Sequence, residues 1–579
     1  MKKFMEKYDI LISAAMIGLL AVIFAWFGSA YVINPIIDSG REFYIPVRML
    51  GGEVLYKDIF NIYGALSYQI NALAYMIFGV HLRSLTIFGV LNLGLIVSTV
   101  VFIIGEFLKI DKTKEKFCYE NLGILFFAFT LIAVSFINFS IFNFIAPYAF
   151  AMTYGLSAFL LSVLFLIKFS KNERLLHSSL ACLFAGCAVA CKYEFLAYFI
   201  FVIAYLLFRK NNFKNIIVNA FSLLAVPTIS YGILFLQGMS ISDLVNTSHI
   251  LKAMANTESL KFLYSNFTGT YFSWKLFCYG LLKTSMLLVL GTIAFFAVKF
   301  SKKDKFLNFL VLIFTCFGMY FIGISGFALF AILHFMIYLV FFKKIFANKS
   351  LFVFMTAVLL LSLKTFFVVN IENYGIYTLP FILFSLIFFV SENSDNNEKI
   401  RNFTNVATLI FVGILVSLCF ANVSGLKNRD YISVDNPRFN NILTFPISGI
   451  STNKHVAKVF QESADYVKKT TEPKDRVVVL PESQFFNFVT KRPADNLYDS
   501  LTPMYFEAFG EENVISHFEE TKPEYFILNN RNTGDYGKRF ICEDYAQNFC
   551  TFVYNNYDKI KTFESGGFNF KLYKRKDLK

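Results

Sequence analysis

The chain has 579 residues, of which 56% are hydrophobic and only 16% are charged, and its mean hydropathy is +0.55. A typical globular chain is about a quarter charged. This composition excludes a disordered chain, a secreted disulfide scaffold and a soluble multidomain protein, because so much apolar surface must meet lipid. The formal charge of +14 does not indicate nucleic-acid binding, since the Lys and Arg residues form short clusters between apolar runs. Such clusters are typical of the cytoplasmic loops of an integral membrane protein.

Apolar runs follow one another along most of the chain. The first run follows Lys2, Lys3 and Lys7 and lacks a small-residue cleavage site, which predicts a retained helix with a cytoplasmic N-terminus. Reading on from it, we expect a mostly α-helical polytopic protein with about 13 transmembrane helices. The expected spans are 10–33, 84–107, 121–138, 148–168, 176–191, 195–208, 216–236, 276–299, 306–323, 326–342, 350–369, 374–390 and 403–421.

One semi-polar segment, 63–79, decides on which side the later loops lie. It carries Tyr68, Gln69 and Asn71 within an otherwise apolar stretch. If it lies at the membrane interface without crossing, the loops assigned to the cytoplasm between 109 and 401 hold 19 Lys and Arg residues, against six on the other side. That distribution obeys the positive-inside rule. We therefore expect an interfacial helix here and a tail outside the cytoplasm.

Two of the expected spans are short and are joined by Lys192-Tyr193-Glu194. Read as one helix, residues 178–208 would bury two charges in the middle of the bilayer, which is expensive. The pattern instead predicts two short helices that meet at a shallow, water-filled cavity. By the same reasoning Lys364 is expected near the outer end of its helix.

The tail, residues 422–579, is polar enough to form a small extracytoplasmic α/β domain. Hydrophobic periodicity predicts helices at 455–469, 513–520 and 545–554. Strands are expected at 476–480 and 525–528, and Gly566-Gly567 indicates a hairpin between 560–563 and 568–573. A disulfide between Cys542 and Cys550 is left open, and it becomes more favourable in an oxidising compartment.

The richest charged cluster lies in the outer loop 34–83, directly after the first span. Asp38 is placed at headgroup depth, where a carboxylate can serve as general base for an acceptor hydroxyl. At this depth the reacting group would be a sugar carried on a lipid-linked phosphate. Its transfer needs positive charge to stabilise the departing phosphate, and the candidates are Arg41, Lys192 and Lys364. Glu42 is the second catalytic candidate, with a simple ion pair to Arg41 as the alternative. No Gly-rich nucleotide loop is present.

The segments 38–46, 50–58 and 63–68, with the sequences DSGREFYIP, LGGEVLYKD and YGALSY, resemble the first outer loop of GT-C fold glycosyltransferases. That family includes the protein O-mannosyltransferases and the lipid A aminoarabinose transferase. The resemblance implies that Asp38 is the catalytic base and that a basic residue at the Lys192 turn faces the donor phosphate. The sequence departs from the family pattern at Ala65, where family members often have Pro. The resemblance also implies supporting or substrate-binding roles for the following residues: Tyr56, Lys57, Asp58, Tyr63, Glu194 and Tyr374.

The family often pairs its base with a second acidic group from a later outer loop. Glu194, Asp243 and Glu258 are the candidates, and the sequence does not choose among them. No cofactor is identified, and a divalent metal is left open.

Together these features predict a transmembrane glycosyltransferase domain over 1–421 and a soluble domain over 422–579. The expected reaction moves a hexosyl or pentosyl group from a polyprenyl-phosphate donor to an extracytoplasmic lipid, polysaccharide or protein, in a bacterial inner or plasma membrane. The alternative is a transporter or flippase for a lipid-linked sugar, which would favour charges near the bilayer midplane. A third reading is a non-catalytic membrane scaffold.

Overall fold

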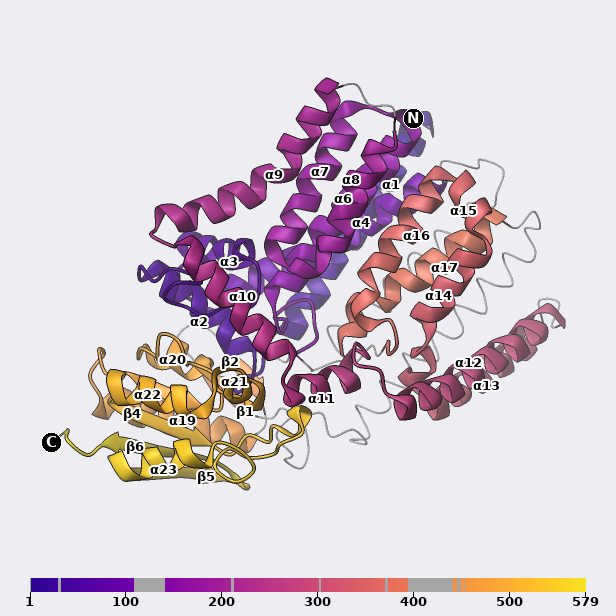
Figure 1. Ribbon diagram of the computed structural model, residues 1–579. Helices are drawn as coiled ribbons and strands as arrows, with labels where there is room; N and C mark the ends of the chain where they lie inside the picture. The colour runs from indigo at the N-terminus through magenta and orange to yellow at the C-terminus, as the bar shows by residue number, and fades with distance from the viewer. Residues whose placement is uncertain are drawn as a thin grey trace.

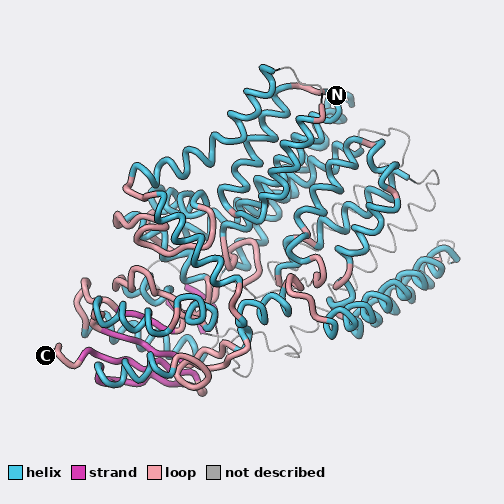
Figure 2. Tube along the Cα trace, in the orientation of Figure 1, coloured by secondary structure: helices cyan, strands magenta, loops and turns pink. Residues whose placement is uncertain are grey.

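The computed structural model describes residues 2–29, 33–108, 141–209, 213–300, 304–369, 373–393, 441–444, 449–452 and 454–578. In these ranges a bundle of helices stands on a smaller domain formed by the tail (Figure 1). Figure 2 shows that the strands are confined to this tail domain. The expected spans 121–138 and 403–421 lie outside the described residues.

The bundle contains helices at most of the positions that the apolar runs predict. The longer ones are α1 (Lys2–Gly28), α4 (Leu82–Leu108), α6 (Phe150–Asn172), α7 (Leu175–Cys191), α8 (Leu196–Leu207), α9 (Phe213–Leu236), α12 (Trp274–Phe300), α13 (Lys305–Ile322), α14 (Phe330–Val340), α16 (Lys349–Leu361) and α17 (Leu379–Asn393). Short turns and one short helix join several of them: η3 (Tyr193–Phe195), η4 (Ile324–Phe327), α15 (Phe342–Ala347), η5 (Leu363–Thr365) and η6 (Tyr374–Tyr377).

Four helices in the described residues are long and apolar enough to cross a membrane: α4, α6, α9 and α12. A fifth span results if α13 and α14, which meet at a bend of 84°, count as one crossing. The expected count of 13 is therefore not confirmed. Several expected spans are shorter in the structure, because α16 ends at Leu361 and α17 begins only at Leu379.

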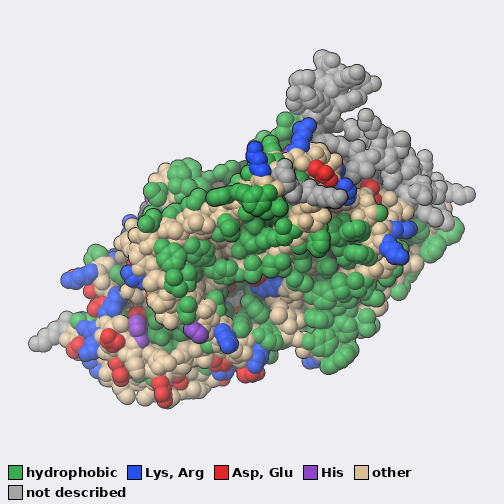
Figure 3. All heavy atoms as spheres, turned by 45° about the horizontal axis from the view of Figure 1, so that its top comes forward, with side chains coloured by type: hydrophobic (Ala, Val, Ile, Leu, Met, Phe, Trp, Pro, Cys, Tyr) green, Lys and Arg blue, Asp and Glu red, His purple; other side chains and the backbone are tan. Residues whose placement is uncertain are grey.

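The spanning helices differ in what surrounds them. In α6, 89% of the most apolar window is buried inside the protein, against 17% in α9 and 28% in α12. Apolar side chains that are not buried by protein must face lipid in a membrane protein. Figure 3 shows apolar side chains gathered over the bundle and charged ones gathered over the tail domain.

Shorter helices lie between the bundle and the tail domain. They are α2 (Ser39–Leu50), α3 (Ala65–Phe78), α10 (Ile241–Ala255) and α11 (Glu258–Phe267). The predicted interfacial segment is α3, and its polar side chains point into the protein: Asn71 accepts a hydrogen bond from the Tyr154 hydroxyl at 2.9 Å. The side chain of Gln69 hydrogen-bonds Ser230 of α9.

The tail domain is built on a four-stranded sheet of order β3-β4-β6-β5. Strands β3 (Val477–Leu480) and β4 (Tyr525–Asn529) are parallel, while β5 (Tyr557–Ser565) and β6 (Phe568–Arg575) form the hairpin that the two glycines predict. The helices are α19 (Lys454–Thr470), α20 (Gln484–Thr490), α21 (Pro503–Phe509), α22 (Glu511–Thr521) and α23 (Gln547–Asn556). A separate two-stranded sheet pairs β1 (Asn441–Thr444) with β2 (Gly449–Thr452). Both parallel strands are fully buried, although β3 lies at the edge of the sheet. Their near-continuous apolar sequences are typical of parallel strands that are covered on both faces.

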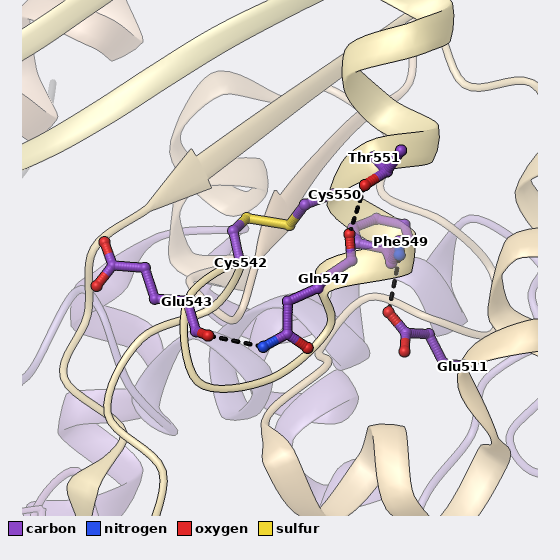
Figure 4. The surroundings of a disulfide bond; sticks show 7 residues. All are labelled: Glu511, Cys542, Glu543, Gln547, Phe549, Cys550 and Thr551. Atoms are coloured by element: carbon purple, nitrogen blue, oxygen red, sulfur yellow. Dashed lines mark hydrogen bonds between the residues drawn. A yellow bond between two sulfur atoms is a disulfide. The ribbon is translucent and has the colours of Figure 1, made fainter.

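A disulfide joins Cys542 to Cys550, with the two Cα atoms 5.5 Å apart. It ties the loop before α23 to the first turn of that helix (Figure 4). Beside it, the carboxylate of Glu511 accepts a hydrogen bond from the Phe549 amide at 2.7 Å, which anchors α22 to α23. The pair that the sequence left open is thus bonded.

The tail domain docks directly on α2. Adding a Cβ atom to Gly40 would place it 2.3 Å from the Phe485 amide nitrogen, so only glycine permits this approach. Farther along α2, the Arg48 guanidinium bridges to Asp499 at 3.0 Å, and the Ala494 amide donates to the Tyr44 hydroxyl at 3.0 Å. These contacts fix the helix that follows Asp38 against the tail.

Candidate active site

A cavity of about 220 Å³ lies where the bundle, α10–α11 and the tail domain meet. Its charged lining consists of four basic residues, Arg41, Lys192, Lys364 and Arg531, and three acidic residues, Asp38, Glu194 and Asp535. The outer loop, the α7–α8 connection, the end of α16 and the tail therefore converge at one end of the bundle. The sequence placed all four of these segments on the same side of the membrane.

Asp38 occupies the N-cap position of α2 and lines the cavity. Its φ of 31° lies in the left-handed region, which aspartate tolerates better than most residues. Its carboxylate lies 3.3 Å from the Arg41 guanidinium and its side chain is 27% exposed. Burial raises the pKa of Asp38, and the charges of Arg41 and Arg531 partly oppose that rise. A carboxyl group with a raised pKa is better suited to act as a general base near neutral pH.

Arg41 is fixed from several sides. It donates a 2.7 Å hydrogen bond to the Tyr148 carbonyl, and its guanidinium lies 5.1 Å from the centre of the Tyr63 ring. Its Nε lies 3.3 Å from Glu42. Because these contacts hold the guanidinium beside Asp38, Arg41 presents a preorganised positive charge to the cavity.

Glu42, the second catalytic candidate, is not among the residues that line the cavity. Its side chain is fully buried. The carboxylate accepts hydrogen bonds from the Tyr68 hydroxyl at 2.7 Å and from the Phe150 amide at 2.8 Å. Phe150 begins α6, and a carboxylate at a helix N-terminus is favourable. The sequence could not distinguish this positioning residue from Asp38, because both are acidic residues of the same short loop.

Lys192, Glu194 and Lys364 form a second charged group, which we call the bundle triad. One oxygen of Glu194 lies 3.1 Å from the Lys192 ammonium and 2.6 Å from that of Lys364. Tyrosine rings cover both cations: Lys192 lies 4.8 Å from the Tyr148 centroid and Lys364 lies 4.0 Å from the Tyr374 centroid. The net charge of the triad is positive.

The turn that carries Lys192 joins α7 to α8, as the sequence predicts. The Gly64 amide donates to the Cys191 carbonyl at 3.0 Å. A Cβ on Gly64 would lie 2.1 Å from the Ala190 carbonyl oxygen, which explains the glycine after Tyr63. Burial lowers the pKa of Lys192 to about 7, against the opposing effect of Glu194.

The other sequence candidates divide into two groups. Tyr63 and Tyr374 line the cavity. Tyr56, Lys57 and Asp58 do not: the Tyr56 hydroxyl donates to the Tyr63 carbonyl at 2.5 Å, Lys57 is exposed, and Asp58 accepts from the Val54 amide at 2.8 Å. These three residues shape the loop that holds Tyr63.

Of the three candidates for a second acidic group, only Glu194 lines the cavity. Asp243 caps α10 through a capping box with Ser240, and Glu258 pairs with Lys261 at the surface. Both are ordinary helix-start residues. Among the described residues no group of three or more His, Cys, Asp and Glu side chains is placed to hold a metal ion.

The tail domain contributes cavity residues that the sequence did not identify: Met504, Arg531, Asp535 and Tyr536. Arg531 follows β4, and Asp535 and Tyr536 belong to the turn η7 (Gly534–Tyr536). In a polar tail, charged residues give no burial signal, so nothing in the sequence separated these from surface residues. Apolar side chains of α10 and α11, such as Met254 and Leu263, close another part of the wall.

A second cavity, of about 390 Å³, adjoins the first. The two share Glu194, Tyr264, Lys364 and Tyr374 as lining residues. The remaining lining of the second cavity is mostly apolar and comes largely from the end of α16 and the turns η3, η5 and η6, including Phe195, Leu360 and Leu361. A charged cavity thus borders an apolar one across the bundle triad.

Comparison with solved structures gives several matches, including two structures of one protein. ArnT from Cupriavidus metallidurans bound to undecaprenyl phosphate is 10% identical over 96% of this chain and 97% of its own, with a TM-score of 0.43. The apo state of the same protein is 9% identical over the same shares, with a TM-score of 0.42. No family model and no curated protein matches the sequence. ArnT is the lipid A aminoarabinose transferase, one of the proteins that the outer loop resembles. Since both TM-scores lie below 0.5, the case for a function rests on the site itself.

Proposed function

We propose that this protein is an integral membrane glycosyltransferase that takes a sugar from a polyprenyl-phosphate donor, with Asp38 as the general base. The observation that carries the proposal is the joining of two cavities. A charged cavity contains a carboxylate of raised pKa beside fixed cations, and an apolar cavity shares Glu194 and Lys364 with it. A lipid-linked sugar phosphate needs both environments next to each other.

The donor phosphate is assigned to Arg41, Lys192 and Lys364. Charge-assisted hydrogen bonds from such groups to phosphate are short and about twice as strong as neutral ones. The bundle triad has one cation more than it has carboxylates, so it has charge to give to a phosphate. The prenyl chain would enter the apolar cavity between the end of α16 and the turn η3, where its burial from water is favourable.

The reaction is a displacement at the anomeric carbon. The acceptor hydroxyl oxygen attacks that carbon, its proton passes to the Asp38 carboxylate, and the bond from carbon to phosphate oxygen breaks. Polyprenyl phosphate leaves with the electron pair, and the cations stabilise its added charge. A single displacement inverts the anomeric configuration. Asp38 lies 3.3 Å from Arg41, so base and phosphate-stabilising charge are neighbours.

The flippase alternative receives less support from the same geometry. The charged lining residues gather at one end of the bundle beside the tail domain, whereas translocation would favour charges near the bilayer midplane. A carboxylate held at the entrance of a cavity suits chemistry at the membrane surface.

The test is Asp38→Asn in the purified full-length chain in lipid nanodiscs. Synthetic undecaprenyl-phosphate arabinose, mannose, glucose and galactose are the donors, and release of undecaprenyl phosphate is measured with a membrane extract as the acceptor source. General-base catalysis contributes about 10²–10⁴-fold, so release falls by at least about that lower factor. The matched control is Asp558→Asn, an exposed carboxylate on β5, which leaves release unchanged. Full release by Asp38→Asn refutes the assignment, and lipid translocation without release by the wild type favours the flippase.

A further inference from the structure

The tail domain builds its part of the cavity wall at the carboxyl ends of its two parallel strands. Glu482 follows β3 and Arg531 follows β4. The Asn529 side chain joins the two ends by donating to the Glu482 carbonyl at 3.0 Å. In α/β domains, ligands bind outside the carboxyl ends of parallel strands. The tail thus presents the edge of its sheet where ligand sites form.

The charges at this edge form a group that we call the tail triad: Glu482, Arg531 and Asp535. The Arg531 guanidinium is 2.6 Å from a Glu482 oxygen and 3.2 Å from an Asp535 oxygen, and its side chain is only 2% exposed. The Tyr536 ring lies 5.8 Å from the same guanidinium. Two carboxyl groups therefore flank one cation, and burial raises the pKa of Glu482 to about 8. Of the three residues, Arg531 and Asp535 line the cavity.

Asp535 has one oxygen that the protein does not satisfy. Its Oδ2 pairs with Arg531, while Oδ1 is buried and has no hydrogen-bond partner among the described residues. The side chain is 10% exposed and lines the same cavity as Asp38. A buried acceptor without a donor is unfavourable, so this oxygen is suited to receive a hydrogen bond from a ligand in the cavity.

The chemistry of the wall selects the ligand. A carboxylate oxygen requires an O–H or N–H donor. An ionised phosphate offers only acceptor oxygens, so the Asp535 carboxylate and a phosphate repel each other. Aromatic rings of Tyr536 and Tyr264 also line the cavity and offer flat apolar surface to a sugar ring. A hydroxyl-rich, uncharged ring satisfies these conditions, whereas an anionic lipid headgroup does not.

We propose that Asp535 and Tyr536 form the subsite for the acceptor, and that the acceptor presents a neutral sugar hydroxyl to Asp38. This inference rests on the proposed function, since it assigns the second substrate of the same reaction. Asp535 receives a hydrogen bond from one hydroxyl of the ring, which turns a neighbouring hydroxyl toward Asp38. Asp535 is a positioning residue, and the proton of the reacting hydroxyl still passes to Asp38.

The experiment measures binding at the two substrates' sites separately. Full-length protein in nanodiscs is loaded with undecaprenyl phosphate, and saturation-transfer NMR is recorded with methyl glucoside, methyl mannoside, methyl galactoside and glycerol 1-phosphate. The wild type should bind at least one glycoside more tightly than glycerol 1-phosphate. Asp535→Ala should weaken that binding by about tenfold or more, a loss of roughly 1.4 kcal/mol. Undecaprenyl phosphate binding should stay unchanged.

Tyr536→Phe, which keeps the ring, should retain glycoside binding, and Asp558→Ala is the matched control. Hydrogen exchange of β4 checks that each variant is folded. The inference is overturned by undiminished glycoside binding in folded Asp535→Ala, by absence of any glycoside signal in the wild type, or by preference for glycerol 1-phosphate. If Asp535→Ala does not fold, Tyr536→Ala takes its place with the same expected loss. Failure of the proposed function is distinct, because it shows as failure to bind undecaprenyl phosphate or as full activity of Asp38→Asn.

Discussion

The bundle and the tail domain each contribute three charged residues, and the signs of the central and flanking groups are reversed between them. In the bundle triad one carboxylate, Glu194, sits between two lysines, while in the tail triad one guanidinium, Arg531, sits between two carboxylates. Asp38 and Arg41 lie in the cavity that both triads border. On the proposed function, this difference lets one small cavity bind two substrates in different places. The phosphate binds on the bundle side, and an uncharged hydroxyl donor binds on the tail side.

The largest effect is expected from removing the centre of the tail triad. Arg531→Gln leaves Glu482 and Asp535 facing each other without their cation, and breaking a buried pair in this way costs about 3–5 kcal/mol. Hydrogen exchange of β3 and β4 in the full-length chain measures the loss. Arg531→Gln combined with Glu482→Gln should recover part of it. Unchanged protection in the single variant would mean that the triad does not stabilise the tail.

Removing a cation from the bundle triad should act on donor binding instead of tail stability. Lys364→Ala deletes one charge-assisted contact to phosphate, which is worth about 1.5–3 kcal/mol. We expect the KM for the donor to rise by about tenfold to a hundredfold, with protection of β4 unchanged. Lys559→Ala, an exposed lysine on β5, is the control. An equal rise in KM in Lys364→Ala and Lys559→Ala would show that the bundle triad has no special role in donor binding.

The seam between the domains can be tested at Gly40. Gly40→Ala forces a Cβ against the Phe485 amide, and overpacking of this kind costs about 1–3 kcal/mol. We expect faster hydrogen exchange in α20 together with slower transfer. Gly232→Ala on α9 is the matched control, since a Cβ there meets nothing within 4 Å. Normal transfer by Gly40→Ala would show that the reaction tolerates separation of the two walls.

The smallest effect is expected in the pH profile. Transfer should rise with pH as Asp38 loses its proton, at a pH above the ordinary range of aspartate because burial raises its pKa. It should fall again as Lys192 loses its charge, since burial lowers its pKa to about 7. Lys192→Arg keeps the charge at all these pH values. Initial rates of donor cleavage from pH 5 to 9 should therefore lose the alkaline decline in that variant, and an unchanged decline would assign it to another group.

Much of the bundle side could be predicted from the sequence. Charges beside apolar runs are costly, so Asp38, Lys192 and Lys364 stood out, and the structure brings all three to one cavity. In the tail, the periodicity of α19 and the glycine pair of the β5–β6 hairpin predicted local structure correctly. These sequence patterns are local. They predict the structure correctly because each one depends only on which side chains of a single segment must be buried.

The tail's contribution could not be predicted in the same way. Arg531 and Asp535 lie in a polar stretch where charge is unremarkable. Arg531 is buried by its pairing with Glu482, about 50 residues earlier in the sequence, and the turn η7 that carries Asp535 packs on α11 of the bundle side. The surroundings of Glu42 were equally out of reach of the sequence, since its position beside Arg41 resembles a catalytic pair while its partners Tyr68 and Phe150 come from other elements. Contacts between residues so far apart in the sequence cannot be predicted from the residue spacing within one segment.

The glycine contact between α2 and the tail has a consequence for biosynthesis. The ribosome makes Asp38 long before Asp535, and the two halves of the site meet only when Phe485 reaches Gly40. A growing chain therefore holds Asp38 in an incomplete pocket until the tail domain has been made. On the proposed function, the nascent protein stays inert toward lipid-linked sugars until the tail domain has folded, and removal of that domain would abolish transfer as loss of Asp38 does.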